Sequence, residues 1–226
     1  MSDALPASLE QELVEWIPRA ERDGAHFLAS GDQGRVLFYD NGQERLAIKV
    51  PSYRGIGRWI SIWMLRREAR VYERLSGLSG VPRCHGLLCG RYLVLEYIEG
   101  ENLRNACIPD RDAFYGELLR VIRTMHARGV AHADLKRRDN IMVDGDSRPW
   151  LLDFGAASIR RSRGPINRRL FNIARQFDLN AWVKHKYQRK LDQASEQDRR
   201  YLHRTWLERS AARIKQWWQW LVRVRR

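Results

Sequence analysis

The sequence has few cysteines and no long uncharged apolar run. Its three cysteines, Cys84, Cys89 and Cys107, form an odd set without regular spacing, which argues against a disulfide-stapled secreted protein. No stretch reaches the roughly 18 apolar residues that a membrane-spanning helix needs. The N-terminal segment carries acidic residues early and has no apolar core of the kind found in signal peptides. We therefore expect a cytoplasmic protein.

Excess charge of either sign is missing from the first two thirds of the chain. Residues 1–155 carry equal numbers of acidic and basic side chains, so the formal net charge of +14 falls entirely on residues 156–226. Such asymmetry favours an anionic partner for the last third, which would be a nucleic acid, a phosphorylated substrate or an anionic membrane surface.

The order of predicted elements indicates a small sheet domain followed by a mainly helical one. An amphipathic helix is expected over residues 8–17. A hairpin is expected over 35–50, with Asn41-Gly42 favouring a tight primed turn. A helix should end at Gly77, an apolar strand at Gly100 and a further helix at Gly129. This order predicts an α+β fold of two lobes, and a cleft between two lobes commonly binds a ligand.

Between residues 31 and 153 the chain offers, in order, the groups that phosphoryl transfer requires. The reaction needs a cation on the leaving phosphates, oxygen ligands for Mg²⁺ and a carboxylate directed at the attacking hydroxyl. Backbone amides of 31–36 could approach phosphates. Lys49 lies on the next strand, and Glu68, expected at the start of the following helix, could hold it in an ion pair. Asp134 could orient the nucleophile, while Asn140 and Asp153 could hold the metal.

Five motifs in this order resemble those of the protein-kinase-like superfamily. "AIKV" resembles its strand lysine, "REARVYERL" the helix that pairs with this lysine, and "LVLEYIEGENL" the hinge between lobes. "HADL", with the later Asn, resembles the catalytic loop, and "LLDFG" resembles the metal-binding Asp-Phe-Gly. The resemblance covers about residues 25–160. It implies a two-lobed kinase-like fold with an N-lobe over 1–98, a C-lobe over 99–226, and ATP and Mg²⁺ as cofactors.

The resemblance also assigns roles to individual residues. His132 would support the catalytic loop without transferring protons, and Lys136 would either touch the transferred phosphate or be a solvated neighbour of two arginines. Asn140 lies six residues after Asp134 and Asp139 lies five after it; we predict that Asn140 binds the metal. Backbone groups of Glu96 and Ile98 would meet adenine. The implied nucleotide site comprises Gly31, Gly34, Val36, Ala47, Lys49, Glu96 and Ile98, and the catalytic set comprises Asp134, Lys49, Glu68 and Lys136.

The segment after Asp-Phe-Gly departs from the eukaryotic pattern. No "APE" follows, and only about seventy residues remain, most of them in a basic segment. "REARVYERLSGLSGVPRCHG", "GVAHADL" and "DFGAAS" look most like the lipopolysaccharide core-sugar (Kdo/heptose) kinase group. This likeness implies an anionic envelope glycolipid as acceptor. The alternatives are a Ser/Thr protein kinase, a non-catalytic kinase-like binding module and, less favoured, a nucleic-acid-binding protein.

The C-terminal segment 201–226 reads as an amphipathic, Trp-rich basic helix. It would either pack on the C-lobe or lie on an anionic membrane, at the inner face of the inner membrane. A second basic and aromatic group would serve the same surface: Arg54, Arg58, Trp59, Trp63, Arg66 and Arg67.

Overall fold

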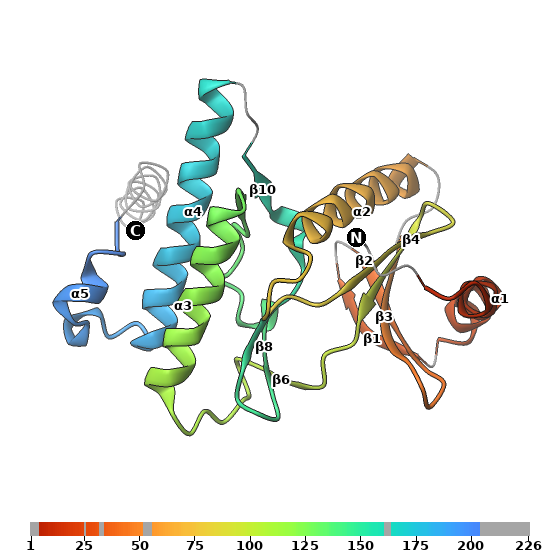
Figure 1. Cartoon of the computed structure of the whole chain (residues 1–226), viewed down its shortest axis with the longest axis horizontal. Coiled ribbons are helices and arrows are strands. Elements are labelled where there is room, and N and C mark those ends of the chain that lie inside the picture. Colours follow the sequence, from red (N-terminus) through yellow and green to blue (C-terminus); the bar gives the residue numbers. More distant parts are fainter. Residues whose placement is uncertain (1–4, 25, 32–33, 52–55, 161–163, 204–226) are drawn as a thin grey trace, which may run out of the picture.

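The computed structural model describes residues 5–24, 26–31, 34–51, 56–160 and 164–203. An antiparallel sheet with a helix on each face forms one lobe, and two long helices with short hairpins form the other (Figure 1). The predicted two-lobed α+β fold is confirmed. None of the described helices has the length and apolarity needed to cross a bilayer. The predicted C-terminal helix falls largely outside the described residues.

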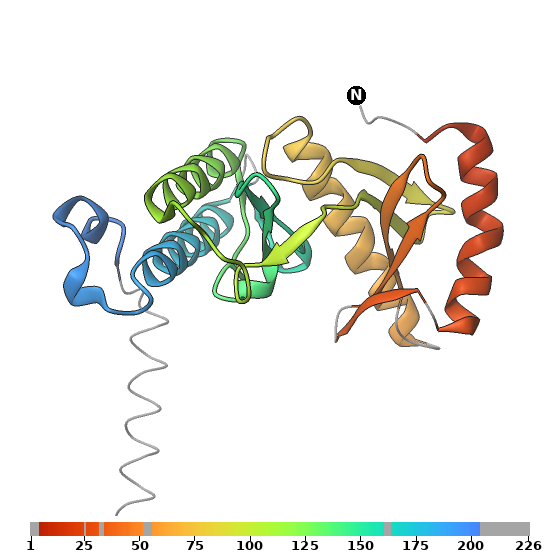
Figure 2. The same ribbon diagram turned by 90° about the horizontal axis from the view of Figure 1, so that it is seen from below.

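The sheet of the first lobe has five strands in the order β1-β2-β3-β5-β4, with every neighbouring pair antiparallel. Helix α1 (Ala7–Asp23) covers one face, and α2 (Ile56–Leu75) runs along the other (Figure 2). The helix predicted over 8–17 therefore continues to Asp23, where Gly24 closes it. The strands are β1 (Phe27–Gly31), β2 (Gly34–Asp40), β3 (Arg45–Val50), β4 (Cys84–Leu88) and β5 (Tyr92–Glu96).

Alternation along β3 places Lys49 on the α2 side of the sheet. Ile48 and Val50 are fully buried in a cluster with Leu13 and Ile17 of α1. Successive side chains of a strand point to opposite faces. Lys49, between the two apolar residues, therefore faces away from α1 and toward α2.

The turn between β2 and β3 differs from the tight primed turn expected for Asn41-Gly42. Asp40 pairs with Arg45, so four residues form the loop, and of the two expected turn residues only Gly42 has a positive φ, of 82°. The Asn41 side chain accepts hydrogen bonds from the backbone N–H groups of Gln43 and Glu44. This local capping by the amide stabilises the longer loop in place of a two-residue turn.

The second lobe is built on two helices that lie side by side, α3 (Arg111–Ala127) and α4 (Pro165–Lys186). The Asp110 side chain caps α3 by accepting from the Ala113 N–H. Short strands and short helical segments make up the rest of this lobe. These are β6 (Gly100–Asn102), β7 (Val130–Ala131), β8 (Ile141–Asp144), β9 (Pro149–Leu151) and β10 (Ser158–Ile159), with single helical turns at Arg138–Asn140, Phe154–Ala156 and Leu191–Gln193 and the short α5 (Glu196–Arg199).

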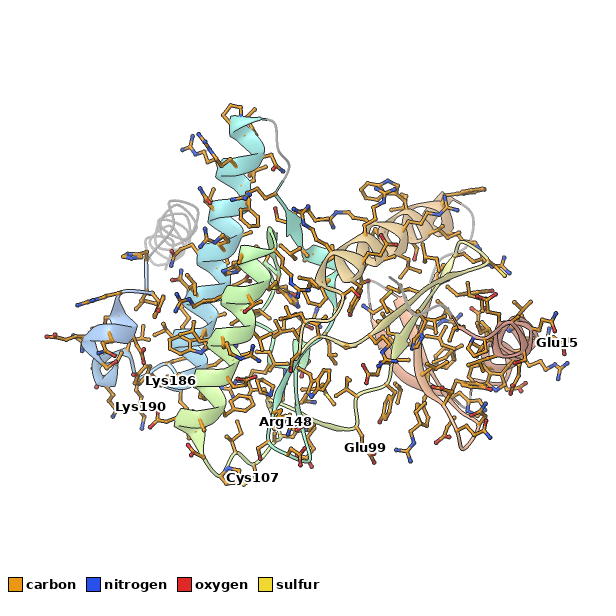
Figure 3. The ribbon with its side chains drawn as sticks, viewed as in Figure 1. Glu15, Glu99, Cys107, Arg148, Lys186 and Lys190 are labelled. Carbon is orange, nitrogen blue, oxygen red and sulfur yellow. The ribbon has the colours of Figure 1, made fainter. Side chains whose placement is uncertain are left out.

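The two lobes share one apolar core. Buried residues of α2 and β5, such as Leu75 and Leu93, belong to the same cluster as Leu118 of α3 and Leu151 of β9. The connection around Glu99 crosses between the lobes at the lower edge of Figure 3. The sheet ends at Glu96 and β6 already pairs with β8, while the lobe boundary at 98/99 stays a prediction.

The first residues of the predicted C-terminal helix are anchored to α4. Tyr201 and Leu202 pack against the shared core. The His203 backbone exchanges hydrogen bonds with the Asn180 side chain, and Gln176 donates to the Tyr201 carbonyl. The remainder of that predicted helix, residues 204–226, lies outside the described residues.

Candidate active site

A triad of charges lies where the two lobes meet. Lys49 Nζ is 2.7 Å from Glu68 Oε1 and 2.9 Å from Asp153 Oδ1. Glu68 also accepts from the Phe154 N–H, at 3.0 Å. The predicted pair of Lys49 and Glu68 is therefore present, but Glu68 lies in the second half of α2 and not at its start. The extent of α2 before Glu68 therefore determines where the Glu68 carboxylate reaches Lys49 on β3.

Burial and charge oppose each other at this triad. Burial alone would lower the pKa of Lys49, but the carboxylates of Glu68 and Asp153 outweigh it and raise that pKa. Burial would likewise raise the pKa of Asp153, and the Lys49 ammonium reverses this effect and lowers it. Lys49 and Asp153 are therefore both charged near neutral pH. An ammonium group held between two carboxylates is suited to donate hydrogen bonds to phosphate oxygens.

The catalytic-loop candidates converge on Asp134. Asn140 is buried, and its Nδ2 donates to the Asp134 carbonyl at 3.1 Å and lies 3.4 Å from Asp134 Oδ2. Asp139 points elsewhere, to Arg104 at 3.0 Å. Lys136 Nζ lies 3.9 Å from Asp134 Oδ1. The structure thus brings Asn140, and not Asp139, beside Asp134; which of the two binds the metal stays a prediction.

Asp178 of α4 was not predicted from the sequence, and it holds the backbone of the catalytic loop. Its fully buried carboxylate accepts from the backbone N–H groups of His132 and Ala133, both at 2.8 Å, and lies 2.9 Å from His126 Nε2. Ala133 has φ 68°, a left-handed conformation that costs a non-glycine residue about 1–2 kcal/mol. Asp178 therefore fixes the strained residue that precedes Asp134. Its only signal in the sequence was an acidic residue within the basic last third of the chain.

Buried rings support the Asp-Phe-Gly segment. Phe154 packs edge-on against Tyr72, and its ring centroid is 4.8 Å from that of His132. His132 Nε2 bonds the Leu152 carbonyl at 2.8 Å, which agrees with the structural role expected for it. Arg67 donates to the carbonyls of Gly155 and Ala157. Arg67 was predicted in a surface patch, and this is corrected, because its guanidinium holds the Asp153 turn.

The residues predicted to hold the nucleotide lie on the five-stranded sheet and in the segment that follows it. Gly31 and Gly34 pair at the ends of β1 and β2, and Val36 pairs with Lys49 across β2 and β3. Ala47 lies opposite Leu95 on β5. In the hinge, the Glu96 N–H already donates to the Arg83 carbonyl. Within the described residues the backbone N–H of Ile98 has no such backbone partner, and its role as the hinge donor for adenine stays a prediction.

The donor set near Asp153 suits a hard cation. Asp153 and Asn140 present carboxylate and amide oxygens, and Mg²⁺ is usually held by one or two such ligands together with substrate phosphates and waters. Among the described residues, no three His, Cys, Asp or Glu side chains gather as a protein-only metal cage would require. The residues present therefore suit Mg²⁺ carried with a nucleotide better than a permanent metal centre.

Taken together, the ion triad, the loop carboxylate and the two-lobed fold define a kinase-type phosphotransferase. The sequence model of the protein kinase domain matches residues 26–192, which is more than half of the chain. The chain therefore belongs to the protein kinase domain family, and the superfamily resemblance is confirmed at that level.

Curated relatives of the chain are kinases with much longer sequences. It is similar to the probable serine/threonine-protein kinase fnkB of Dictyostelium discoideum, with 32% identity over 42% of this chain and 19% of the relative. It is 34% identical to serine/threonine-protein kinase D of Synechocystis, over 46% of this chain and 21% of the relative. With serine/threonine-protein kinase chk1 of Schizosaccharomyces pombe it shares 35% identity over 57% of this chain and 28% of the relative. The chain thus spans less than a third of each relative's length.

Proposed function

We propose that this chain transfers the γ-phosphoryl group of ATP to a hydroxyl, and that the hydroxyl belongs to a serine or threonine of a protein. The observation that carries the transfer is the Lys49–Glu68–Asp153 triad, which lies with Asp134 and Asn140 at one site. The protein acceptor is supported by the names of similar proteins, which include Ser/Thr, dual-specificity and CBL-interacting protein kinases.

Each side chain has a defined task in this proposal. Lys49, held by Glu68, binds the α- and β-phosphates. Asp134 orients the acceptor hydroxyl and accepts its proton as the oxygen attacks. Asp153 and Asn140 would hold Mg²⁺, which neutralises charge on the phosphates when bound. Lys136, exposed beside Asp134, is placed to contact the transferred group.

A specific observation favours a second candidate, an anionic envelope glycolipid. Only residues 160–164 connect β10 to α4, so no long segment is present there to align an extended peptide. The lipopolysaccharide-kinase likeness inferred from sequence belongs to this candidate. The relatives do not support it, and the protein acceptor is therefore preferred.

Contact with an anionic membrane is a further part of this second candidate. Trp59, Ile60 and Trp63 are 74%, 56% and 62% exposed on the outer face of α2, beside the basic Arg58 and Arg66. Exposed tryptophans among arginines suit the headgroup region of a bilayer. Of the six residues predicted in this patch, Arg54 lies outside the described residues and Arg67 serves the active site.

The test is phosphoryl transfer from labelled ATP with Mg²⁺, with casein, histone, core glycolipid and no acceptor offered in parallel. The proposal predicts label on Ser or Thr of protein, removed by chelation of the metal. Asp134→Asn should abolish the label while nucleotide binding remains. Asp146→Asn is a matched control, since Asp146 is an exposed loop residue whose carboxylate, among the described residues, pairs with Arg148. Label confined to glycolipid would select the second candidate, and no transfer at all would reject both.

A further inference from the structure

A strongly basic cavity of about 530 Å³ opens beside the catalytic loop. Its walls come from the loop after Asp134, the C-terminal end of α4 and the segment that follows β6. Figure 3 labels Lys186 and Lys190 at this same end of α4. The cationic side chains that line the cavity are Arg104, Lys136, Arg137, Arg138, Lys184 and Arg189, and its one acid is Asp139.

Only part of this positive charge is paired with carboxylates of the described residues, through Arg104 and Lys136. Six cationic residues and one carboxylate give the lining a formal charge of +5, and that carboxylate pairs with Arg104. In the part of the chain that the structure describes, the guanidinium groups of Arg137, Arg138 and Arg189 make no hydrogen bond or ion pair. Like charges gathered in one cavity repel, so the arrangement is stabilised by an anion bound there.

The cavity is fixed to the catalytic loop by a buried contact. His185 of α4 lines it and bonds through Nε2 to the carbonyl of Leu135, at 2.8 Å. Leu135 follows Asp134 directly, and Lys136, the next residue, spans from the cavity to within 3.9 Å of the Asp134 carboxylate. An extended peptide covers roughly 3.3–3.6 Å per residue. A side chain bound in the cavity can therefore belong to a residue only a few positions away from the residue at the site of transfer.

We propose that this cavity is an acceptor subsite that binds a phosphorylated or acidic side chain of the protein substrate, a few positions from the serine or threonine that is modified. The inference rests on the proposed kinase function. A phosphorylated side chain carries about −1.5 to −2 charges and three strong acceptor oxygens. Arginine forks bind such groups through paired N–H donors. The volume, within the roughly 300–1,000 Å³ of ligand pockets, accommodates that side chain together with its backbone.

The lining favours a protein segment over a lipid. Apart from Ala181, every residue that lines the cavity is charged or polar. Among the described residues, no exposed large apolar residue lines the cavity, and Ile166 and Leu170 lie toward the opposite end of α4, roughly 20–30 Å away at 1.5 Å per helical residue. Of the described lining residues only Ala181 could contact an acyl chain, whereas a hydrophilic peptide needs no apolar contact.

The experiment compares peptides that contain one serine and differ only in a phosphoserine, glutamate or alanine placed one to four residues on either side. The wild-type protein should use the best phosphorylated peptide with kcat/KM about tenfold or more above the alanine peptide. Added inorganic phosphate should compete with that peptide and not with ATP. In parallel, fluorescence anisotropy of a labelled phosphopeptide measures binding without turnover.

Arg138→Gln, Arg189→Gln and the double variant test the cavity. Each should lower kcat/KM for the phosphopeptide several-fold, and the double variant about tenfold, while the alanine peptide is used as before. Arg123→Gln is the matched control, because Arg123 is exposed on α3 and does not line the cavity. Circular dichroism melting verifies that each variant is folded, and Arg189→Lys should retain most of the preference.

The outcomes separate this inference from the function on which it rests. Equal use of phosphorylated and alanine peptides, or a preference that survives in the double variant, would overturn the subsite. So would displacement of the phosphopeptide by phosphoinositide vesicles but not by soluble acidic peptide, which would assign the cavity to a lipid. Absence of any phosphoryl transfer rejects the kinase proposal; the anisotropy measurement then decides the cavity by itself.

Discussion

Replacing Asp178 by asparagine tests whether the active site depends on a carboxylate that never touches substrate. Asp178 is fully buried and accepts from the N–H groups of His132 and Ala133. Asparagine keeps one acceptor oxygen and turns an NH₂ group toward one of these donors. A lost hydrogen bond to a charged group costs about 1.5–3 kcal/mol. The new NH₂ group also faces a backbone N–H, and two donors that meet without an acceptor add to this cost. We expect unfolding free energy to fall by about 3 kcal/mol.

The expected loss is measurable in two ways. For a chain of this size each kcal/mol lowers Tm by roughly 2–4 °C, so Asp178→Asn should melt about 6–12 °C below wild type. Ala133, with φ 68°, should relax once its anchor is weakened and carry Asp134 with it. We therefore expect kcat to fall by about tenfold or more at temperatures where the variant is fully folded, because small displacements of a catalytic group are costly.

Asp198→Asn is the control that separates stability from catalysis. Asp198 is also buried and bonds Lys186 and Tyr187, far along the chain from the catalytic loop. It should lower Tm without lowering kcat of the folded protein. The reasoning about Asp178 is refuted if its asparagine variant melts within about 2 °C of wild type, or if its kcat equals that of the Asp198 variant.

Three further predictions concern the metal, the nucleotide and pH. Asn140→Ala should raise the Mg²⁺ concentration needed for half-maximal turnover about tenfold or more, and Asp139→Ala should leave it unchanged; the reverse result would reassign the metal ligand. Lys49→Met should lower kcat/KM for ATP by about 10²-fold or more, leaving Glu68 and Asp153 without their shared cation, and titration calorimetry should show weakened ATP binding. Burial, and then the nearby Arg138, Arg189 and Lys184 charges, lower the pKa of His185, although its bond to Leu135 opposes them. Its contribution to stability is therefore complete above the unfolded pKa of about 6.5 and declines as pH falls from there toward the lowered folded pKa; His185→Gln should flatten the fall of Tm between pH 7 and 5.5, and an unchanged slope would contradict this.

The patterned elements and the ordered motifs could be predicted from sequence, because each depends on local composition. Alternation in β3 and the helical spacing of α2 brought Lys49 and Glu68 into the expected pair. The helix of Glu68 was placed too late, however, since its first turn holds Trp59 and Ile60 on an exposed face and gives no apolar periodicity to count. The prediction of a two-residue hairpin turn was wrong because the sequence was compatible with two turns. The Asn41 side chain stabilises a four-residue loop instead.

Contacts between distant segments could not be predicted in this way. Asp178 is separated from Ala133 by 45 residues and carries no motif of its own. Arg67 stood among surface arginines in the sequence, and only the packing of α2 against the Asp153 turn shows that its donors are used there. Such roles follow from which helix face meets which loop, a tertiary property that spacing along one chain does not contain.

The six-residue separation of Asp134 and Asn140 and the basic cavity have one physical cause. Both ends of the loop are fixed, because the Leu135 carbonyl is held by His185 and the Asn140 amide is held by Asp134. The four residues between these points must therefore turn outward, and Lys136, Arg137 and Asp139 are exposed as a result. Their charged side chains therefore point toward solvent or toward the cavity, whose opposite wall is formed by Arg104 and α4. The six-residue separation thus keeps the Asn140 amide beside Asp134, while the residues between them add to the cationic surface next to the site of transfer.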